Sequence, residues 1–164
     1  QPLEKKYQLT RRCLEALLDH QFSVNILTRS PLCLRDMDLY KQFKAIEVGV
    51  SITTHDERIK RIFEPHSPPI DARIDALRTL RREKISTYAF VGPMLPLEPS
   101  PLVKMLDGLV DEVLIDQLNY SNKVKALYRR AKLDQYLAED YFHYVGLELK
   151  ERFERKGIPV TMCY

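Results

Sequence analysis

The chain has 164 residues, of which 45% are apolar and 30% charged, values typical of one soluble globular domain over residues 1–164. A formal net charge of +3 permits a nucleic-acid or phosphate partner without arguing for one. No apolar run approaches the roughly 20 residues of a transmembrane helix, so we expect no membrane association.

The cysteines and histidines argue against a disulfide scaffold and against a metal site. The three cysteines, Cys13, Cys33 and Cys163, are widely separated, and an odd number suits a reducing cytoplasm. No histidine stands at metal-ligand spacing from a cysteine. We therefore predict a cytoplasmic protein without a metal site of its own, in which Cys13 and Cys33 are small buried hydrophobic residues.

Hydrophobic periodicity predicts helices and strands that alternate along the whole chain. Apolar residues at three- and four-residue steps mark the helices, and short apolar runs mark the strands. In chain order, the predicted elements are helix 3–20, strand 22–28, helix 36–43, strand 46–52, helices 55–64 and 70–84, strand 86–91, helix 100–109, strand 112–117, helices 123–133 and 139–156, and strand 158–162. Ser67 and Ser100, each followed by proline, are expected to cap the helices that they precede.

This alternation predicts an α/β fold with parallel strands and right-handed crossovers. Five strands are too few for an eight-stranded barrel, so we expect a partial TIM-like (β/α) barrel. The chain begins with Gln1 instead of methionine and starts inside the pattern, which suggests the C-terminal part of a longer parent whose first strands are absent. Such a piece would expose an apolar flank of its sheet and associate with itself through that flank.

Polar residues follow the strands where each apolar run ends. They are Thr28, Arg29 and Ser30 after the first strand, residues 51–55 after the second, Gly92 after the third and residues 116–119 after the fourth. Because the carboxyl ends of parallel strands lie on one side of a sheet, we expect one shared surface. Its groups suit a ligand with carboxylate, amine and ribose groups. The sequence shows no nucleophile–base pair and no glycine-rich phosphate loop, so it identifies no catalytic residue.

The same side chains also have purely structural interpretations. Arg29 could pair with Asp36 or Glu47 at the surface. Ser51 could simply end its strand or cap the next helix. Arg73 could pair with its aspartate neighbours on the same helix.

Eight short segments form an ordered series over about residues 1–120. They are Gln1-Pro2-Leu3-Glu4, Leu9-Thr10-Arg11, Ile26-Leu27-Thr28-Arg29-Ser30, Leu34-Arg35-Asp36, Val48-Gly49-Val50-Ser51-Ile52-Thr53-Thr54, Glu64-Pro65, Ala72-Arg73-Ile74 and Pro93-Met94-Leu95-Pro96. Taken together, they resemble the spore photoproduct lyase-like (DNA repair photolyase-like) branch of the radical S-adenosylmethionine (SAM) enzymes.

The resemblance implies an enzyme with a partial (β/α) barrel, whose [4Fe–4S] cluster binds SAM and releases a 5′-deoxyadenosyl radical. It also implies roles for the strand ends. Arg29 would contact the SAM carboxylate in place of the more usual lysine, with its two hydroxyl neighbours beside it. Ser51 would be the hydroxyl contact to SAM, Arg73 a further carboxylate partner, and Gly92 a neighbour of the adenine.

One feature of that family is missing from this sequence. Its three-cysteine motif, with cysteines at four- and three-residue steps, is absent, and the spacing of the three cysteines present cannot replace it. We therefore expect SAM and the cluster to be cofactors of a longer lyase-like parent, and this chain alone to be inactive without them. Damaged DNA is one candidate substrate. The alternative is a non-catalytic α/β module that binds a nucleotide or a protein partner.

Overall fold

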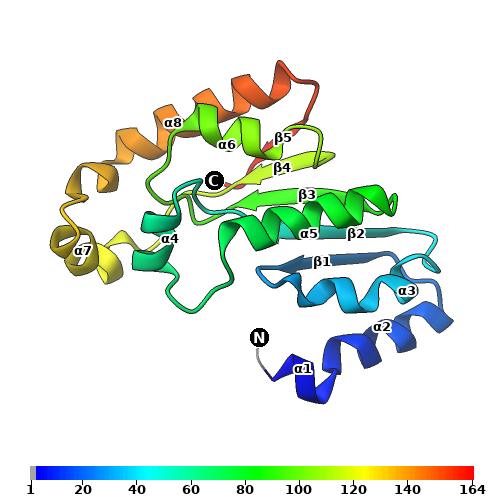
Figure 1. Cartoon of the computed structure of the whole chain (residues 1–164). Helices are drawn as coiled ribbons and strands as arrows, with labels where there is room; N and C mark the ends of the chain where they lie inside the picture. The colour runs from blue at the N-terminus through cyan, green and yellow to red at the C-terminus, as the bar shows by residue number, and fades with distance from the viewer. Residues whose placement is uncertain (1–2) are drawn as a thin grey trace.

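The computed structural model describes residues 3–164, and Figure 1 shows helices and strands alternating along the chain. Gln1 and Pro2, which open the series of similar segments, lie outside the described residues. The elements are α1 Glu4–Tyr7, α2 Leu9–Asp19, β1 Val24–Thr28, η1 Pro31–Asp36, α3 Met37–Tyr40, β2 Ile46–Ser51, α4 Glu57–Phe63, α5 Ile70–Arg82, β3 Ser86–Val91, α6 Pro99–Leu106, β4 Glu112–Ile115, α7 Ser121–Arg130, η2 Asp134–Leu137, α8 Glu139–Glu154 and β5 Val160–Met162.

The strands form one sheet in the order β1-β2-β3-β4-β5, and every neighbouring pair is parallel. This confirms the predicted α/β fold with parallel strands. Within residues 3–164, β1 and β5 are the two edges, so the sheet is open, which is consistent with a partial (β/α) fold. No helix in the described part of the chain is long and apolar enough to cross a membrane.

One face of the sheet is buried beneath helices. Val50, Ala89 and Val113, from three neighbouring strands, pack with Leu77 of α5 and Leu106 of α6. A second apolar cluster joins β1 and β2 to α2 and α3. Because successive residues of a strand point to opposite faces, this packing places the intervening side chains on the other face.

That other face is partly open at β1. Leu27 is 47% exposed, and the ring of Tyr88 lies across Gly49, where any Cβ atom would overlap the ring. The hydroxyl of Tyr88 donates a hydrogen bond to Asn25 Oδ1 at 2.6 Å. The absence of a side chain at Gly49 therefore lets β3 reach across β2 to the edge strand β1.

The predicted cap at Ser67 is wrong. The helix α5 begins at Ile70, its N-cap residue is Pro69, which makes no side-chain cap, and the amide of Ile70 instead donates to the Glu57 carboxylate at 3.0 Å. The hydroxyl of Ser67 instead donates to the carbonyl of Glu64 at 2.8 Å. A residue that precedes proline is disfavoured in the helical conformation, so the proline pair delays the helix and releases Ser67 for another contact.

Two smaller expectations also need correction. The helix α6 begins at Pro99, so Ser100 lies inside its first turn, and proline suits the first helical position. Cys33 is buried as expected, but Cys13 is exposed, because the buried side of α2 centres on Leu14.

Gly49→Ala is expected to destabilise the chain by about 1–3 kcal/mol, because the new methyl group must displace the ring of Tyr88. The free energy of unfolding from urea titrations measures this. In a Tyr88→Ala background, where the ring is gone, the same substitution should cost much less. Equal costs in both backgrounds would show that the ring does not impose the glycine.

Candidate functional site

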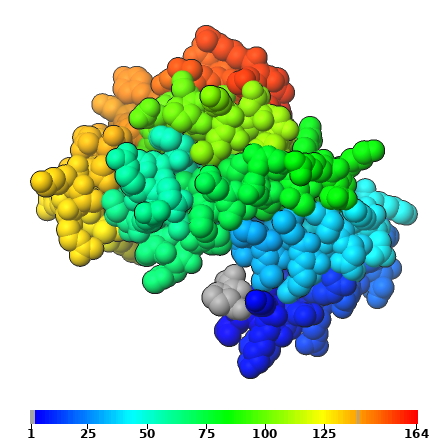
Figure 2. Space-filling model, viewed as in Figure 1, coloured from blue at the N-terminus to red at the C-terminus, as the bar shows by residue number. Residues whose placement is uncertain are grey.

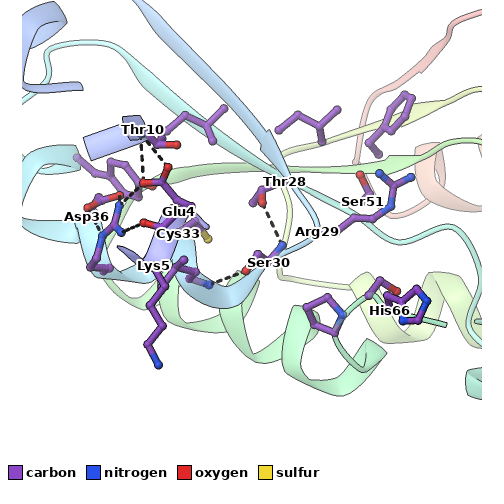
Figure 3. Close-up of a pocket in the computed structure, with 18 residues that line it drawn as sticks. Glu4, Lys5, Thr10, Thr28, Arg29, Ser30, Cys33, Asp36, Ser51 and His66 are labelled. Carbon is purple, nitrogen blue, oxygen red and sulfur yellow. Dashed lines mark hydrogen bonds and ion pairs between the residues drawn. The ribbon is translucent and has the colours of Figure 1, made fainter. Parts of the chain in front are cut away.

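A cavity of about 940 Å³ opens where β1 and β2 end. Four of the six predicted site residues line it, namely Thr28, Arg29, Ser30 and Ser51, together with Phe90 of β3. Figure 3 shows the four predicted residues toward one end of the cavity and the side chains of the N-terminal segment toward the other. The convergence of strand ends expected from the sequence is therefore found for β1 and β2.

The two other predicted residues lie behind this cavity. Arg73 and Gly92 are not among its described lining residues, but each contacts one that is. Arg73 Nη1 donates to the carbonyl of Ser51 at 3.1 Å, and the carbonyl of Gly92 accepts a longer contact from Arg29 Nη2 at 3.4 Å. The polar residues after β4 are also absent from the described lining. We predicted one surface shared by the polar residues after all four strands. The structure brings together at the cavity only those after β1 and β2.

Glu64 connects two of the predicted site residues, although the sequence pattern included it only within the segment Glu64-Pro65 and gave it no role in the site. It follows α4, and its Oε1 accepts a hydrogen bond from Arg29 Nε at 3.0 Å. Its Oε2 accepts one from Arg73 Nη2 at 2.7 Å. Arg29 therefore pairs with neither Asp36 nor Glu47, and Arg73 does not pair with its aspartate neighbours on α5. Each arginine uses the same distant carboxylate.

Arg73 is almost completely buried, with 1% of its side chain exposed. Its remaining donors are also engaged, because Nε bonds the carbonyl of Pro68 at 3.0 Å and Nη2 bonds the hydroxyl of Ser67. A buried guanidinium is tolerated only when its charge and its donors are compensated. This geometry makes Arg73 the internal anchor of Glu64, and the SAM contact implied by the resemblance stays a prediction.

The charge of Glu64 is stabilised by its two arginines. Burial alone raises the pKa of its carboxyl, but the hydrogen bond and charge of Arg73, with the charge of Arg29, outweigh burial and hold the pKa below the ordinary 4.5. At neutral pH the three side chains therefore carry one negative and two positive charges. The net charge of the cluster is positive, and its exposed member is Arg29, whose side chain is 42% accessible.

The hydroxyl groups beside Arg29 are held by their own backbone. Thr28 Oγ1 accepts from the amide of Ser30 at 3.0 Å, and Ser30 Oγ accepts from the amide of Leu32 at 3.2 Å. These bonds use the oxygens as acceptors and leave each hydroxyl proton for another partner. The turn thus offers two oriented hydroxyl donors next to a cation.

The other end of the cavity is lined by a second ion-pair network, whose contacts the sequence pattern did not reveal. Asp36 is 1% exposed and accepts from Arg35 Nε and Nη2, each at 2.8 Å. Arg35 also bonds the Glu4 carboxylate at 2.9 Å, which attaches α1 to η1. Glu4 in turn accepts from the amide of Thr10 at 3.1 Å, near the start of α2.

The chain has relatives among curated proteins, although no protein-family model matches it. An uncharacterized protein of Methanocaldococcus jannaschii is 46% identical over 95 residues, which is 58% of this chain and 36% of that protein. An uncharacterized protein of Acidianus two-tailed virus is 34% identical over 95 residues, which is 57% of this chain and 32% of that protein. The match with this chain thus spans about a third of each curated relative.

Among solved structures, the chain is similar to spore photoproduct lyase complexed with dinucleoside spore photoproduct. The TM-score is 0.65 over 94% of this chain and 55% of that one, with 13% sequence identity. At this identity the likeness shows the fold. It agrees with the partial (β/α) fold expected from the sequence.

Arg73→Met is expected to destabilise the chain by about 3–5 kcal/mol, because it leaves Glu64 buried without its closest cation. Urea denaturation measures the change. Arg82→Met, an exposed substitution on the same helix, is the matched control and should change stability by less than about 0.5 kcal/mol. Similar effects of the two substitutions would contradict the anchoring role of Arg73.

Proposed function

We propose that this chain forms one wall of the SAM-binding cavity in a longer radical SAM enzyme of the spore photoproduct lyase type. The observation that carries this proposal is the convergence of Thr28, Arg29, Ser30 and Ser51 on one cavity at the carboxyl ends of parallel strands. In α/β proteins such ends are the usual place for a ligand. The fold shared with spore photoproduct lyase supports the same proposal.

The chemistry of the cavity suits the amino-acid and ribose parts of SAM. Arg29 supplies a planar cation that matches a carboxylate, and the hydroxyls of Thr28, Ser30 and Ser51 can bond carboxylate or ribose oxygens. Gly92 would contribute through its carbonyl, which helps to hold Arg29. In this proposal Arg73 acts from behind the cavity, through Glu64 and the carbonyl of Ser51.

The cysteines of this chain do not fit a [4Fe–4S] cluster. Cys13 is exposed on α2, Cys33 is buried in η1, and Cys163 follows β5 at the opposite edge of the sheet. Among the described residues no group of three histidine, cysteine, aspartate or glutamate side chains could hold a metal ion. In the proposed enzyme, the cluster would have to be held by cysteines outside these 164 residues.

A second observation bears on the substrate, for which we propose nucleic acid. The segment 121–133, which contains α7, carries five basic and no acidic residues, so its formal charge is +5. Since the whole chain carries +3, the remainder carries −2. The five are the exposed residues Lys123, Lys125, Arg129, Arg130 and Lys132. Figure 2 shows this segment as an outer surface at one end of the molecule.

The basic segment is held in place by its apolar side. The ring of Tyr128 packs against Phe63 of α4, with centroids 4.5 Å apart. Among residues 3–164, Arg129 is the one member of the five with an ion pair, a 3.6 Å contact to Asp134. Tyr120, which precedes α7, is 75% exposed and could stack on a base. Cations of this kind suit a phosphate backbone.

For SAM binding, Arg29→Ala in the longer protein is expected to raise the dissociation constant at least tenfold, because the variant cannot form the charge-assisted hydrogen bond to the carboxylate. Ser51→Ala should have a smaller effect in the same direction. Isothermal titration calorimetry on protein prepared without oxygen, with iron and sulfide, measures both. Arg82→Ala is the control. Unchanged affinity in both cavity variants would refute the site.

For nucleic acid, replacing Arg129 and Arg130 with alanine is expected to weaken binding of a fluorescent 20-nucleotide single strand. Fluorescence anisotropy across a salt series measures it, and the salt slope should fall by about 0.7 for each phosphate that the variant no longer neutralises. The charge-matched control is Arg82→Ala with Lys104→Ala, on α5 and α6. Equal effects of the two pairs would show non-specific attraction. Nucleic-acid binding without SAM binding would favour the non-catalytic binding module.

A further inference from the structure

Glu64 occupies a position between a buried and an exposed cation. Its own side chain is 13% exposed, against 1% for Arg73 and 42% for Arg29. The exposed fractions therefore rise in order from the anchor, through the carboxylate, to the residue that lines the cavity. Only the last of the three faces a ligand directly.

The Glu64 carboxylate is fixed from both of its oxygens. Besides Arg29, Oε1 accepts from the hydroxyl of Thr53 at 3.2 Å. Oε2 accepts from Arg73, and it also lies 3.2 Å from the hydroxyl of Ser67, whose single proton it shares with the carbonyl of Glu64. A carboxylate with donors on each oxygen can neither rotate nor withdraw without breaking a bond, so it is a rigid acceptor for Arg29.

Arg29 is oriented by two contacts that leave part of its guanidinium for a ligand. Nε is directed at Glu64, and Nη2 reaches the carbonyl of Gly92. A guanidinium has five donors in one plane, so these contacts set the plane without using Nη1. A free arginine side chain would instead sample many rotamers, and each would have to be ordered upon binding.

We infer that Glu64 is a positioning residue, which holds Arg29 in the orientation required to bind the carboxylate of the ligand. This inference rests on the proposed function of the cavity. In this role a carboxylate increases the affinity for an anionic ligand. This is unexpected, because a negative charge near an anion site should by itself repel the anion. Pairing with Arg73 offsets that repulsion, and the ordering of Arg29 outweighs what is left.

The direction in which SAM affinity changes when Glu64 loses its charge distinguishes positioning from simple repulsion. Glu64→Gln keeps the shape of the side chain and removes its charge. If Glu64 positions Arg29, the variant should bind SAM about tenfold more weakly in calorimetry on the longer protein. If Glu64 only lowers the local potential, the variant should bind SAM more tightly. Tighter or unchanged binding would overturn the inference.

Glu57→Gln is the matched control. Glu57 lies on α4, pairs with Lys60 and Arg61, and bonds the amide of Ile70, but it does not line the cavity. Its loss of one negative charge should leave SAM affinity within about twofold of the wild type. Should Glu64→Gln fail to fold, Thr53→Val removes one donor to Glu64 while keeping the charge. It should weaken SAM binding about threefold, and unchanged affinity would refute the inference.

A second measurement on the 164-residue chain does not depend on SAM. In nitrogen-15 NMR spectra, the Arg29 Nε–H signal, assigned by its disappearance in Arg29→Ala, should exchange slowly with water in the wild type and in Glu57→Gln. It should exchange rapidly in Glu64→Gln. Slow exchange in Glu64→Gln would overturn the positioning role. Absence of SAM binding in every protein would instead count against the proposed function, so the two failures are distinguishable.

Discussion

The ion pair between Arg73 and Glu64 is the interaction on which the carboxyl end of the sheet depends. Removing a guanidinium from water costs several kcal/mol, and Arg73 is 1% exposed, so its donors need acceptors. The acceptors come from the segment after α4 and from the end of β2. One buried cation therefore fixes a turn that has little regular structure, and it joins that turn to the strand that supplies Ser51.

The parallel sheet then determines which side chains Glu64, in the turn after α4, can contact. Register pairs Thr28 of β1 with Val50 of β2, so Arg29 and Ser51 leave the sheet side by side. Neighbouring strands lie about 4.8 Å apart, a distance that an arginine side chain spans easily. Glu64 can consequently bond the arginine that follows β1 while it pairs with an arginine from α5. The edge strand is also held on its open face, where Tyr88 passes over Gly49 to Asn25.

The sequence was informative wherever the deciding interactions are local. Alternation of apolar runs predicted the helices, the parallel strands and the place where Thr28, Arg29 and Ser51 would meet, because strand ends follow from periodicity. Partners 35 residues apart, such as Arg29 and Glu64, leave no periodic signal. The sequence therefore suggested Asp36 or Glu47 as a structural partner for Arg29, whereas Asp36 is already engaged by Arg35. Ser67 was misassigned for a different reason, because the two prolines after it delay the start of α5 to Ile70.

The positive charges of the protein occur in two different physical environments. The charge of Arg73 is compensated internally by Glu64, so the cluster presents a single cation, Arg29, at the cavity. The charges of α7 are exposed and densely spaced, and Figure 1 places α7 on the side where β3 and β4 end. At physiological ionic strength, interactions between exposed charges decay over about 8 Å. Under the proposed function, the α7 cations would attract an extended polyanion, whereas the fixed, partly enclosed Arg29 would bind one group at a defined position.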